Sequence, residues 1–200
     1  VKTQGTTFDK AKEDAINEAL LYAGLLSHFV GDMANPMHAT IDYDGWQVGQ
    51  GGVHAYFESE VVSAFPMTLE AEVFHYATSQ NPLEKRVLLR LKDAGMSFQK
   101  DPLRIALALI SDSLDRHDDL LTLDKSSALI ETSRDQKGLR IPAKRKAPIK
   151  VVDEFKPLIT ERLAIGSQIL AYLLQLALDV AVKPSLVGYK SYFYHLNPDF

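Results

Sequence analysis

The sequence contains no cysteine. This absence excludes disulfide scaffolds, thiolate zinc fingers, iron–sulfur clusters and cysteine nucleophiles, whereas metal sites built from nitrogen and oxygen ligands are still available. Positive charge is also scarce, because 22 Lys and Arg against 26 Asp and Glu leave a formal net charge of −4. The chain as a whole has no positive field to attract a nucleic acid or an anionic membrane, so a polyanionic substrate must be held locally.

Long hydrophobic runs are missing as well. The most apolar window, 163–182, is interrupted by two glutamines, a glycine, a serine and an aspartate, which is typical of a buried helix and not of a transmembrane segment. The first residues, from Val1 onward, are polar and charged, so we expect no signal peptide within this chain. A first residue other than Met suggests processing or missing upstream sequence.

Apolar residues recur with helical periodicity almost throughout, and no run of strand length alternates convincingly. We therefore predict an all-α, multi-helix bundle that forms one domain over 1–200. Helices are expected at about 8–30, 54–65, 68–77, 82–98, 102–121 and 152–182. The first helix is expected to bury one face, formed by Ala15, Ile16, Ala19, Leu20, Ala23, Leu26 and Val30. The last is expected to bury Leu163, Ile169, Leu170, Leu173, Leu174 and Leu176.

Two stretches interrupt this pattern. Residues 31–53 carry Asn-Pro, Asp-Gly and Gly-Gly turn signals, which predict a long irregular loop. Residues 123–152 have the weakest pattern and include the basic, proline-punctuated segment 138–148, which we expect to be a mobile surface loop, with a phosphate contact as the alternative. The aromatic tail 188–200 is expected to pack as a strap over the bundle.

Three of the six histidines, His28, His38 and His54, fall within 27 residues, inside or beside the first loop. His28 stands four residues before Asp32, and His54 stands four residues before Glu58. Residues at this spacing lie one above the other on a helix, so each pair can present an imidazole nitrogen and a carboxylate oxygen to one ion.

About one His–carboxylate pair at this spacing is expected by chance in such a composition, so the combination carries the hypothesis and no single pair does. Two helical pairs flank a loop in which Pro36 restricts the backbone that presents His38. Apolar neighbours predict a half-buried His28 ring that needs a partner. The alternative is a core histidine bonded to Asp32, with His54 and Glu58 as a solvated pair.

The segment Ser27-His28-Phe29-Val30-Gly31-Asp32-Met33-Ala34-Asn35-Pro36-Met37-His38-Ala39 resembles the central motif of the zinc-dependent phospholipase C and S1/P1 nuclease superfamily. That motif reads His, three residues, Asp, five residues, His, with Gly before the Asp. Gly52-Val53-His54-Ala55-Tyr56-Phe57-Glu58 resembles the next motif, His, three residues, Glu or Asp. Together the two matches cover about 30 residues.

The resemblance implies a mainly helical, secreted or periplasmic phosphodiesterase with a cluster of up to three zinc ions, of which at least one is expected here. By motif position, His38, His54 and Glu58 hold one zinc with a place open to water, His28 binds a second, and Asp32 bridges the second and third. Asp32 and Glu58 thereby act in catalysis as ligands that position the water. Clustered cations make hydroxide available near neutral pH and neutralise charge on phosphoryl oxygens.

The substrate implied is a phosphodiester, either a phospholipid or a single-stranded nucleic acid. Glu58 and the Pro-Met before His38 favour the phospholipase branch, whereas the Gly-Gly pair before His54 favours the nuclease branch. The family completes its cluster with an N-terminal Trp and a further His, Asp and His. These ligands have no match before His28, so we expect that upstream sequence is missing, with a reduced cluster as the alternative.

Two other classes of function stay open, namely a non-catalytic zinc-stabilised helical domain and a helical interaction domain without metal. The oligomeric state is also open.

Tyr43 and Trp46 lie between two candidate ligands and are candidates to stack on a base or a choline-like headgroup, with loop anchoring as the alternative. We expect His75 to pack on a helix and the charged residues of 112–119 to be solvated. His195 has no carboxylate closer in sequence than Asp199.

Overall fold

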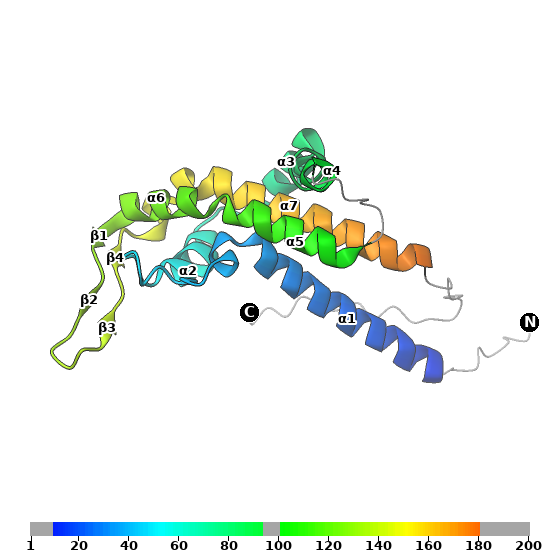
Figure 1. Ribbon diagram of the computed structural model, residues 1–200, viewed down its shortest axis with the longest axis horizontal. Helices are drawn as coiled ribbons and strands as arrows, with labels where there is room; N and C mark the ends of the chain where they lie inside the picture. The colour runs from blue at the N-terminus through cyan, green and yellow to red at the C-terminus, as the bar shows by residue number, and fades with distance from the viewer. Residues whose placement is uncertain (1–9, 94–100, 181–200) are drawn as a thin grey trace, which may run out of the picture.

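Helices make up most of the structure, a computed structural model that describes residues 10–93 and 101–180 (Figure 1). The coarse expectation of a helical fold is confirmed, with short strands as an addition.

The α-helices are α1 (Lys10–Ala34), α2 (Val53–Ala55), α3 (Leu69–Gln80), α4 (Leu89–Asp93), α5 (Pro102–Leu114), α6 (His117–Ser127) and α7 (Val152–Val180). The 3-10 segments are η1 (Pro36–Ala39) and η4 (Pro148–Lys150), and the π-helical segments are η2 (Tyr56–Val61) and η3 (Leu83–Leu88). The strands are β1 (Ala128–Ile130), β2 (Ser133–Arg134), β3 (Arg140–Ile141) and β4 (Lys144–Arg145).

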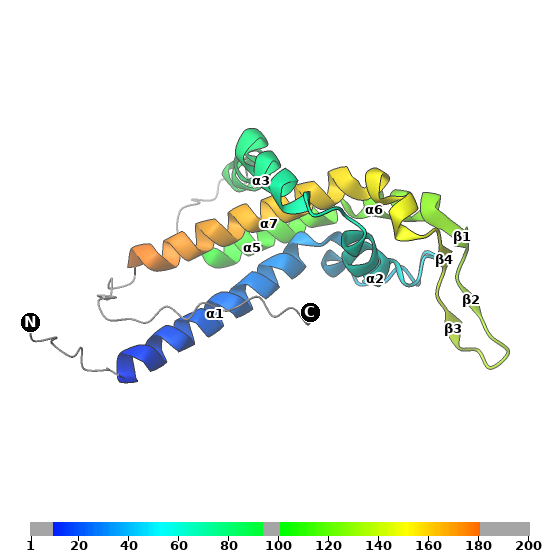
Figure 2. The same ribbon diagram turned by 180° about the vertical axis from the view of Figure 1, so that it is seen from behind.

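The long helix α7 is the axis of the fold. Figures 1 and 2 show α5 beside it, α3 near its middle, and α1 approaching it at an angle. The helices α1 and α7 come close at Gly166, where an added Cβ would lie 3.2 Å from the Cβ of Ala34. A residue without a side chain at this point permits the close approach. None of the described helices is long and apolar enough to cross a membrane.

Two clusters of buried apolar side chains hold the helices together. One lies between the C-terminal part of α1 and helices α4, α5 and α7, and includes Val30 and Leu109. The other surrounds Phe155 near the start of α7 and includes Met37 and Val61. Because Met37 belongs to η1 and Val61 to η2, the second cluster fixes the two segments that flank the long loop.

The expected burial along α1 holds near its C-terminal end, where Val30 is buried and Leu26 packs against the first cluster, and is wrong for Ala15, Ala19 and Leu20. Val30 and Ala34 are buried, but Leu20 is 59% exposed and Ala15 and Ala19 are exposed as well. Figures 1 and 2 both show the N-terminal half of α1 diverging from the other described helices, so its apolar stripe has no helix in the described ranges to pack against. On α7, Leu163 also differs from expectation, since it is 41% exposed.

The helix expected over 102–121 is divided in two. The chain turns after α5, where the backbone N–H of Arg116 donates to the carbonyl of Ser113 (3.0 Å), and α6 then continues to Ser127. The expected solvation of this charged region is wrong for Asp112, whose side chain is fully buried and accepts from Arg86 (2.9 Å) and Arg162 (2.7 Å). These two arginines come from η3 and α7, so long-range pairing replaces solvation.

The segment 138–148, expected to be a surface loop, lies mostly at the surface but contains the strands β3 and β4. The strands β1 and β4 pair antiparallel, as do β2 and β3, and Figure 1 shows this hairpin projecting from the end of the bundle. Arg145 on β4 is not a surface side chain, because only 5% of it is exposed. The predictions for the tail 188–200, for His195 and for 8–9, 94–98 and 181–182 concern residues outside the described ranges.

Candidate metal centre

His38 is presented by a capped 3-10 turn at the end of α1. The Asn35 side chain accepts a hydrogen bond from the backbone N–H of Met37 (3.0 Å), and Pro36 occupies the first position of η1. Proline there restricts the backbone and needs no donor, and Met37 is fully buried in the core. The turn therefore fixes the backbone from which His38 projects.

His54 is placed by the tight loop that precedes α2. Gly45 and Gly52 have φ of +74° and +88°, values that favour glycine, and a Cβ at Gly45 would lie 2.9 Å from the carbonyl oxygen of Gln50. The carboxylate of Asp44 accepts from the backbone N–H of His54 (3.2 Å). This bond satisfies one of the free donors at the start of the helix.

A buried ion pair from the hairpin holds the same loop. Arg145 donates to the Asp124 carboxylate through Nε (2.5 Å) and Nη2 (2.9 Å), and to the carbonyl oxygens of Gln50 (2.6 Å) and Gly51 (3.3 Å). Burial raises the pKa of the Asp124 carboxyl, while the bond from Arg145 lowers it. Sequence reasoning missed this pair because Arg145 is 21 residues from Asp124 and 94 and 95 residues from the two loop carbonyls. The nearest signal was a basic cluster, which indicates a surface.

Glu58 lies in the π-helical segment η2, four residues after His54. π-helical turns are rare and are found frequently at functional sites. The Nδ2 of Asn35 donates to Oε2 of Glu58 (2.8 Å), so one side chain both caps η1 and orients this carboxylate. Sequence reasoning did not assign Asn35 a role, although it lies within the Asn-Pro turn signal.

The polar atoms of three predicted ligands converge. Nε2 of His54 lies 3.0 Å from Nε2 of His38 and 2.7 Å from Oε2 of Glu58, and Nε2 of His38 lies 3.5 Å from the same oxygen. The rings of the two histidines meet edge to face at 4.6 Å. Side-chain exposure of 33%, 21% and 49% for His38, His54 and Glu58 leaves the group open to solvent on one side.

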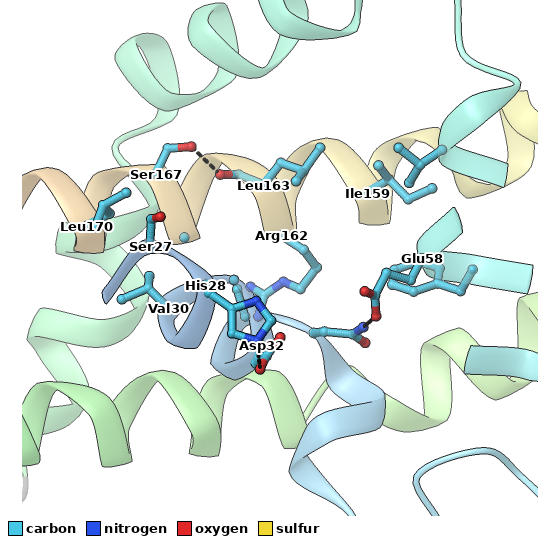
Figure 3. Close-up of a pocket in the computed structure, with 16 residues that line it drawn as sticks. Ser27, His28, Val30, Asp32, Glu58, Ile159, Arg162, Leu163, Ser167 and Leu170 are labelled. Carbon is cyan, nitrogen blue, oxygen red and sulfur yellow. Dashed lines mark hydrogen bonds and ion pairs between the residues drawn. The ribbon is translucent and has the colours of Figure 1, made fainter. Parts of the chain in front are cut away.

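The other two predicted ligands lie beside this triad. Oδ1 of Asp32 is 3.8 Å from Nε2 of His38, and its Oδ2 is 3.4 Å from Nε2 of His28. Asp32 therefore stands between the two histidines, as Figure 3 shows for its pairing with His28. The expected half-burial of His28 is wrong, because its side chain is 69% exposed. Its part of α1 faces outward beside a cleft.

The remaining candidates Tyr43, Trp46 and His75 have different surroundings. The Tyr43 ring stands 6.3 Å from the His54 ring and the residue is 62% exposed, so it borders the site. Trp46 packs against Gly51, where an added Cβ would lie 2.4 Å from its ring, and the Arg140 guanidinium lies 5.4 Å from its ring centroid. These contacts anchor the loop. His75 is exposed on α3, contrary to the expectation of packing.

The donor set fits a zinc ion. At ligand distances of about 2.0–2.2 Å, the ligand atoms of a tetrahedral zinc lie about 3.4 Å apart, and the triad shows 2.7, 3.0 and 3.5 Å. The Nε2 of a neutral imidazole carries at most one proton, so it cannot donate to both His38 and Glu58. A metal ion among the three atoms would be coordinated by all of them at once.

Comparisons with known proteins add no assignment, since no protein-family model, no curated protein and no solved structure matches the chain.

Proposed function

We propose that the chain is a zinc-dependent phosphodiester hydrolase, with a helical fold of the phospholipase C and S1/P1 nuclease type. The observation that carries this proposal is the convergence of His38, His54 and Glu58 to within 3.5 Å of one another. The order and spacing of the ligand residues, which resemble two consecutive motifs of that superfamily, support it independently of the geometry.

The residues divide into a first ion site and a neighbouring one. His38, His54 and Glu58 would hold one zinc, and His28 with Asp32 would contribute to a second. Bound zinc supplies an activated water at neutral pH and neutralises charge on the phosphoryl oxygens.

The chain supports this chemistry by positioning its ligands. Asn35 orients Glu58 through a 2.8 Å hydrogen bond, and the Arg145–Asp124 pair holds the loop that leads into His54. The solvent-exposed side of the triad leaves room for water and a phosphodiester.

A second candidate is a structural zinc site without catalysis. The triad joins the end of α1 and η1 to α2 and η2, so an ion there would cross-link two segments separated by the long loop. Zinc bound only to the native state would stabilise the fold. A structural site is closed by four protein ligands, however, and the open side of this triad favours the catalytic proposal.

The experiment measures zinc content and hydrolysis in the same preparations. Wild-type protein, His54→Ala and the control His75→Ala are purified after expression with zinc. Each is analysed by elemental mass spectrometry and assayed with bis(p-nitrophenyl) phosphate. We expect His54→Ala to lose the metal and nearly all hydrolysis, because alanine keeps the helix but removes a ligand. His75→Ala, an exposed histidine on α3, should match the wild type.

The two candidates give different outcomes. Zinc with hydrolysis that both depend on His54 supports the enzyme, whereas one zinc per chain without hydrolysis supports the structural site. Wild-type protein without zinc, or a His54→Ala variant with full zinc and full activity, contradicts both. Glu58→Gln should weaken zinc binding less than His54→Ala, because an amide oxygen still coordinates but carries no charge.

A further inference from the structure

The hairpin of β1–β4, with the η4 turn that follows it, concentrates the basic residues of the chain. Residues 128–150 hold seven of the 22 Lys and Arg but two of the 26 Asp and Glu, which leaves 15 basic and 24 acidic residues elsewhere. This charge separation turns the hairpin toward an anionic surface, although the net charge of the chain is negative. Figures 1 and 2 show the hairpin projecting from one end of the bundle, where a flat surface can reach it.

The two faces of the hairpin differ in chemistry. Arg134 and Arg140 are cross-strand partners, so both lie on one face, which we call the cationic face. The backbone N–H of Asp135 donates to the carbonyl of Leu139 (3.0 Å), which continues the strand pairing toward the turn. Successive residues of a strand alternate between faces, so Leu139 and Ile141 lie on the opposite face. There they are 63% and 43% exposed.

The two arginines of the cationic face are not neutralised by carboxylates. Neither forms an ion pair with any residue that the structure describes. The Arg134 guanidinium donates to the carbonyl of Gly138 (2.8 Å), and the Arg140 guanidinium lies 5.4 Å from the Trp46 ring centroid. Like charges directly opposite one another destabilise a strand pair. An anion beside them would remove this repulsion, and guanidinium groups match phosphate oxygens in geometry.

Aromatic and aliphatic side chains lie beside the cationic face. A hollow of about 450 Å³ between the hairpin and the loop 41–47 is lined by both arginines, Tyr43 and Trp46. Ile41, in the same lining, is 94% exposed. Tyrosine and tryptophan are enriched at the headgroup level of lipid bilayers. The one carboxylate of this lining, Asp42, accepts from the backbone N–H of Gln47 (2.8 Å), so it is engaged within its own loop.

We propose that the hairpin docks on an anionic phospholipid bilayer. Its arginines and Lys137 contact headgroup phosphates, and Leu139 and Ile141 enter the outer part of the hydrocarbon. A polynucleotide would pair with the basic residues but leave the exposed aliphatic side chains in water. A bilayer accounts for both faces, as it does for amphipathic helices at membrane surfaces. The docking surface contains none of the proposed metal ligands, so this inference does not rest on the proposed function.

The test measures cosedimentation of the full chain with lipid vesicles in EDTA, at about 0.1 M NaCl. Vesicles with about 30% phosphatidylglycerol in phosphatidylcholine are compared with vesicles of phosphatidylcholine alone. Each basic residue near an anionic surface contributes about fivefold in affinity, so three residues predict binding to the anionic vesicles that is at least about 30-fold tighter.

A pair of charge variants locates the binding. Arg134→Gln combined with Lys137→Gln should weaken binding to anionic vesicles at least about tenfold. Lys10→Gln combined with Lys92→Gln removes the same charge from exposed lysines on α1 and α4. This control should change the affinity by less than about threefold, because salt screens charges that are far from the surface. All four side chains are exposed, so both variants should fold.

A pair of leucine variants separates a bilayer from other polyanions. Leu139→Ser should weaken vesicle binding at least about fivefold, because less apolar surface leaves water. Leu103→Ser, at a leucine on α5 that is 67% exposed, should bind as the wild type does.

Absent binding, equal binding to the two kinds of vesicle, or unchanged binding by either hairpin variant would overturn the inference. Binding of a ten-residue oligothymidylate but not of vesicles would assign the hairpin to nucleic acid and also overturn it.

Discussion

Replacement of Arg145 by methionine tests the buried ion pair through which the hairpin holds the loop that precedes His54. Arg145 is 5% exposed and its partner Asp124 is fully buried, and the guanidinium also donates to the carbonyl oxygens of Gln50 and Gly51. Removing one member of a buried ion pair leaves a charge without compensation and typically costs about 3–5 kcal/mol. We expect Arg145→Met to lower the free energy of unfolding by about this amount, measured by urea denaturation with circular dichroism in EDTA.

The loss should depend on pH in a defined direction. Burial raises the pKa of the Asp124 carboxyl, so the folded state holds this proton more tightly than the unfolded chain. Stability from this group is therefore greatest at low pH and declines as pH rises from the ordinary carboxyl range through the raised value. Without Arg145 the pKa should rise further, so the destabilisation should be smaller at about pH 5 than at about pH 8.

Arg134→Met is the matched control. Arg134 lies on the same hairpin, is exposed, and donates to the carbonyl of Gly138. Its replacement should change the free energy of unfolding by less than about 0.5 kcal/mol. If Arg145→Met also costs less than about 1 kcal/mol, or if its cost does not grow with pH, Asp124 and Arg145 do not form the buried pair described above.

Three further outcomes are expected. Asn35→Ala should lower the free energy of unfolding by about 1 kcal/mol, because the η1 cap is lost. It should also weaken zinc binding roughly 10–100-fold, because Glu58 loses its orienting donor. Thermal unfolding with and without zinc measures both effects. Gly51→Ala should cost about 1–3 kcal/mol, because its Cβ would overlap the Trp46 ring, whereas Gly24→Ala, with nothing within 4 Å, should raise the melting temperature. Bound zinc should be released as the pH is lowered, because protons compete for the imidazole nitrogens. Dialysis followed by elemental analysis measures the bound zinc, and zinc retained at low pH would contradict the prediction.

Helices were predictable where apolar periodicity is strong. The last helix, expected at 152–182, agrees with α7 at every described residue, and the spacing of His54 and Glu58 correctly indicated neighbours on one helical turn. The first helix was placed to within a few residues, but the N-terminal part of its apolar face is exposed. Periodicity identifies an apolar stripe without showing whether another element covers it.

The parts that sequence reasoning missed depend on contacts between distant segments. Asp112 looks solvated in a run of charges, and only the fold shows that Arg86 and Arg162 surround it. The same holds for Arg145, which a basic segment suggests is on the surface although it pairs with Asp124. Local propensity contains no information on such pairs, because the cost of burying each charge is offset by a partner far away in the chain.

Anomalous X-ray diffraction at the zinc absorption edge, on crystals of the zinc-loaded protein, tests the proposed metal centre most directly. We predict a peak about 2.0–2.2 Å from Nε2 of His38, Nε2 of His54 and a carboxylate oxygen of Glu58. A peak elsewhere in the molecule, or none at this triad in protein that elemental analysis shows to contain zinc, would contradict the assignment of these residues as metal ligands.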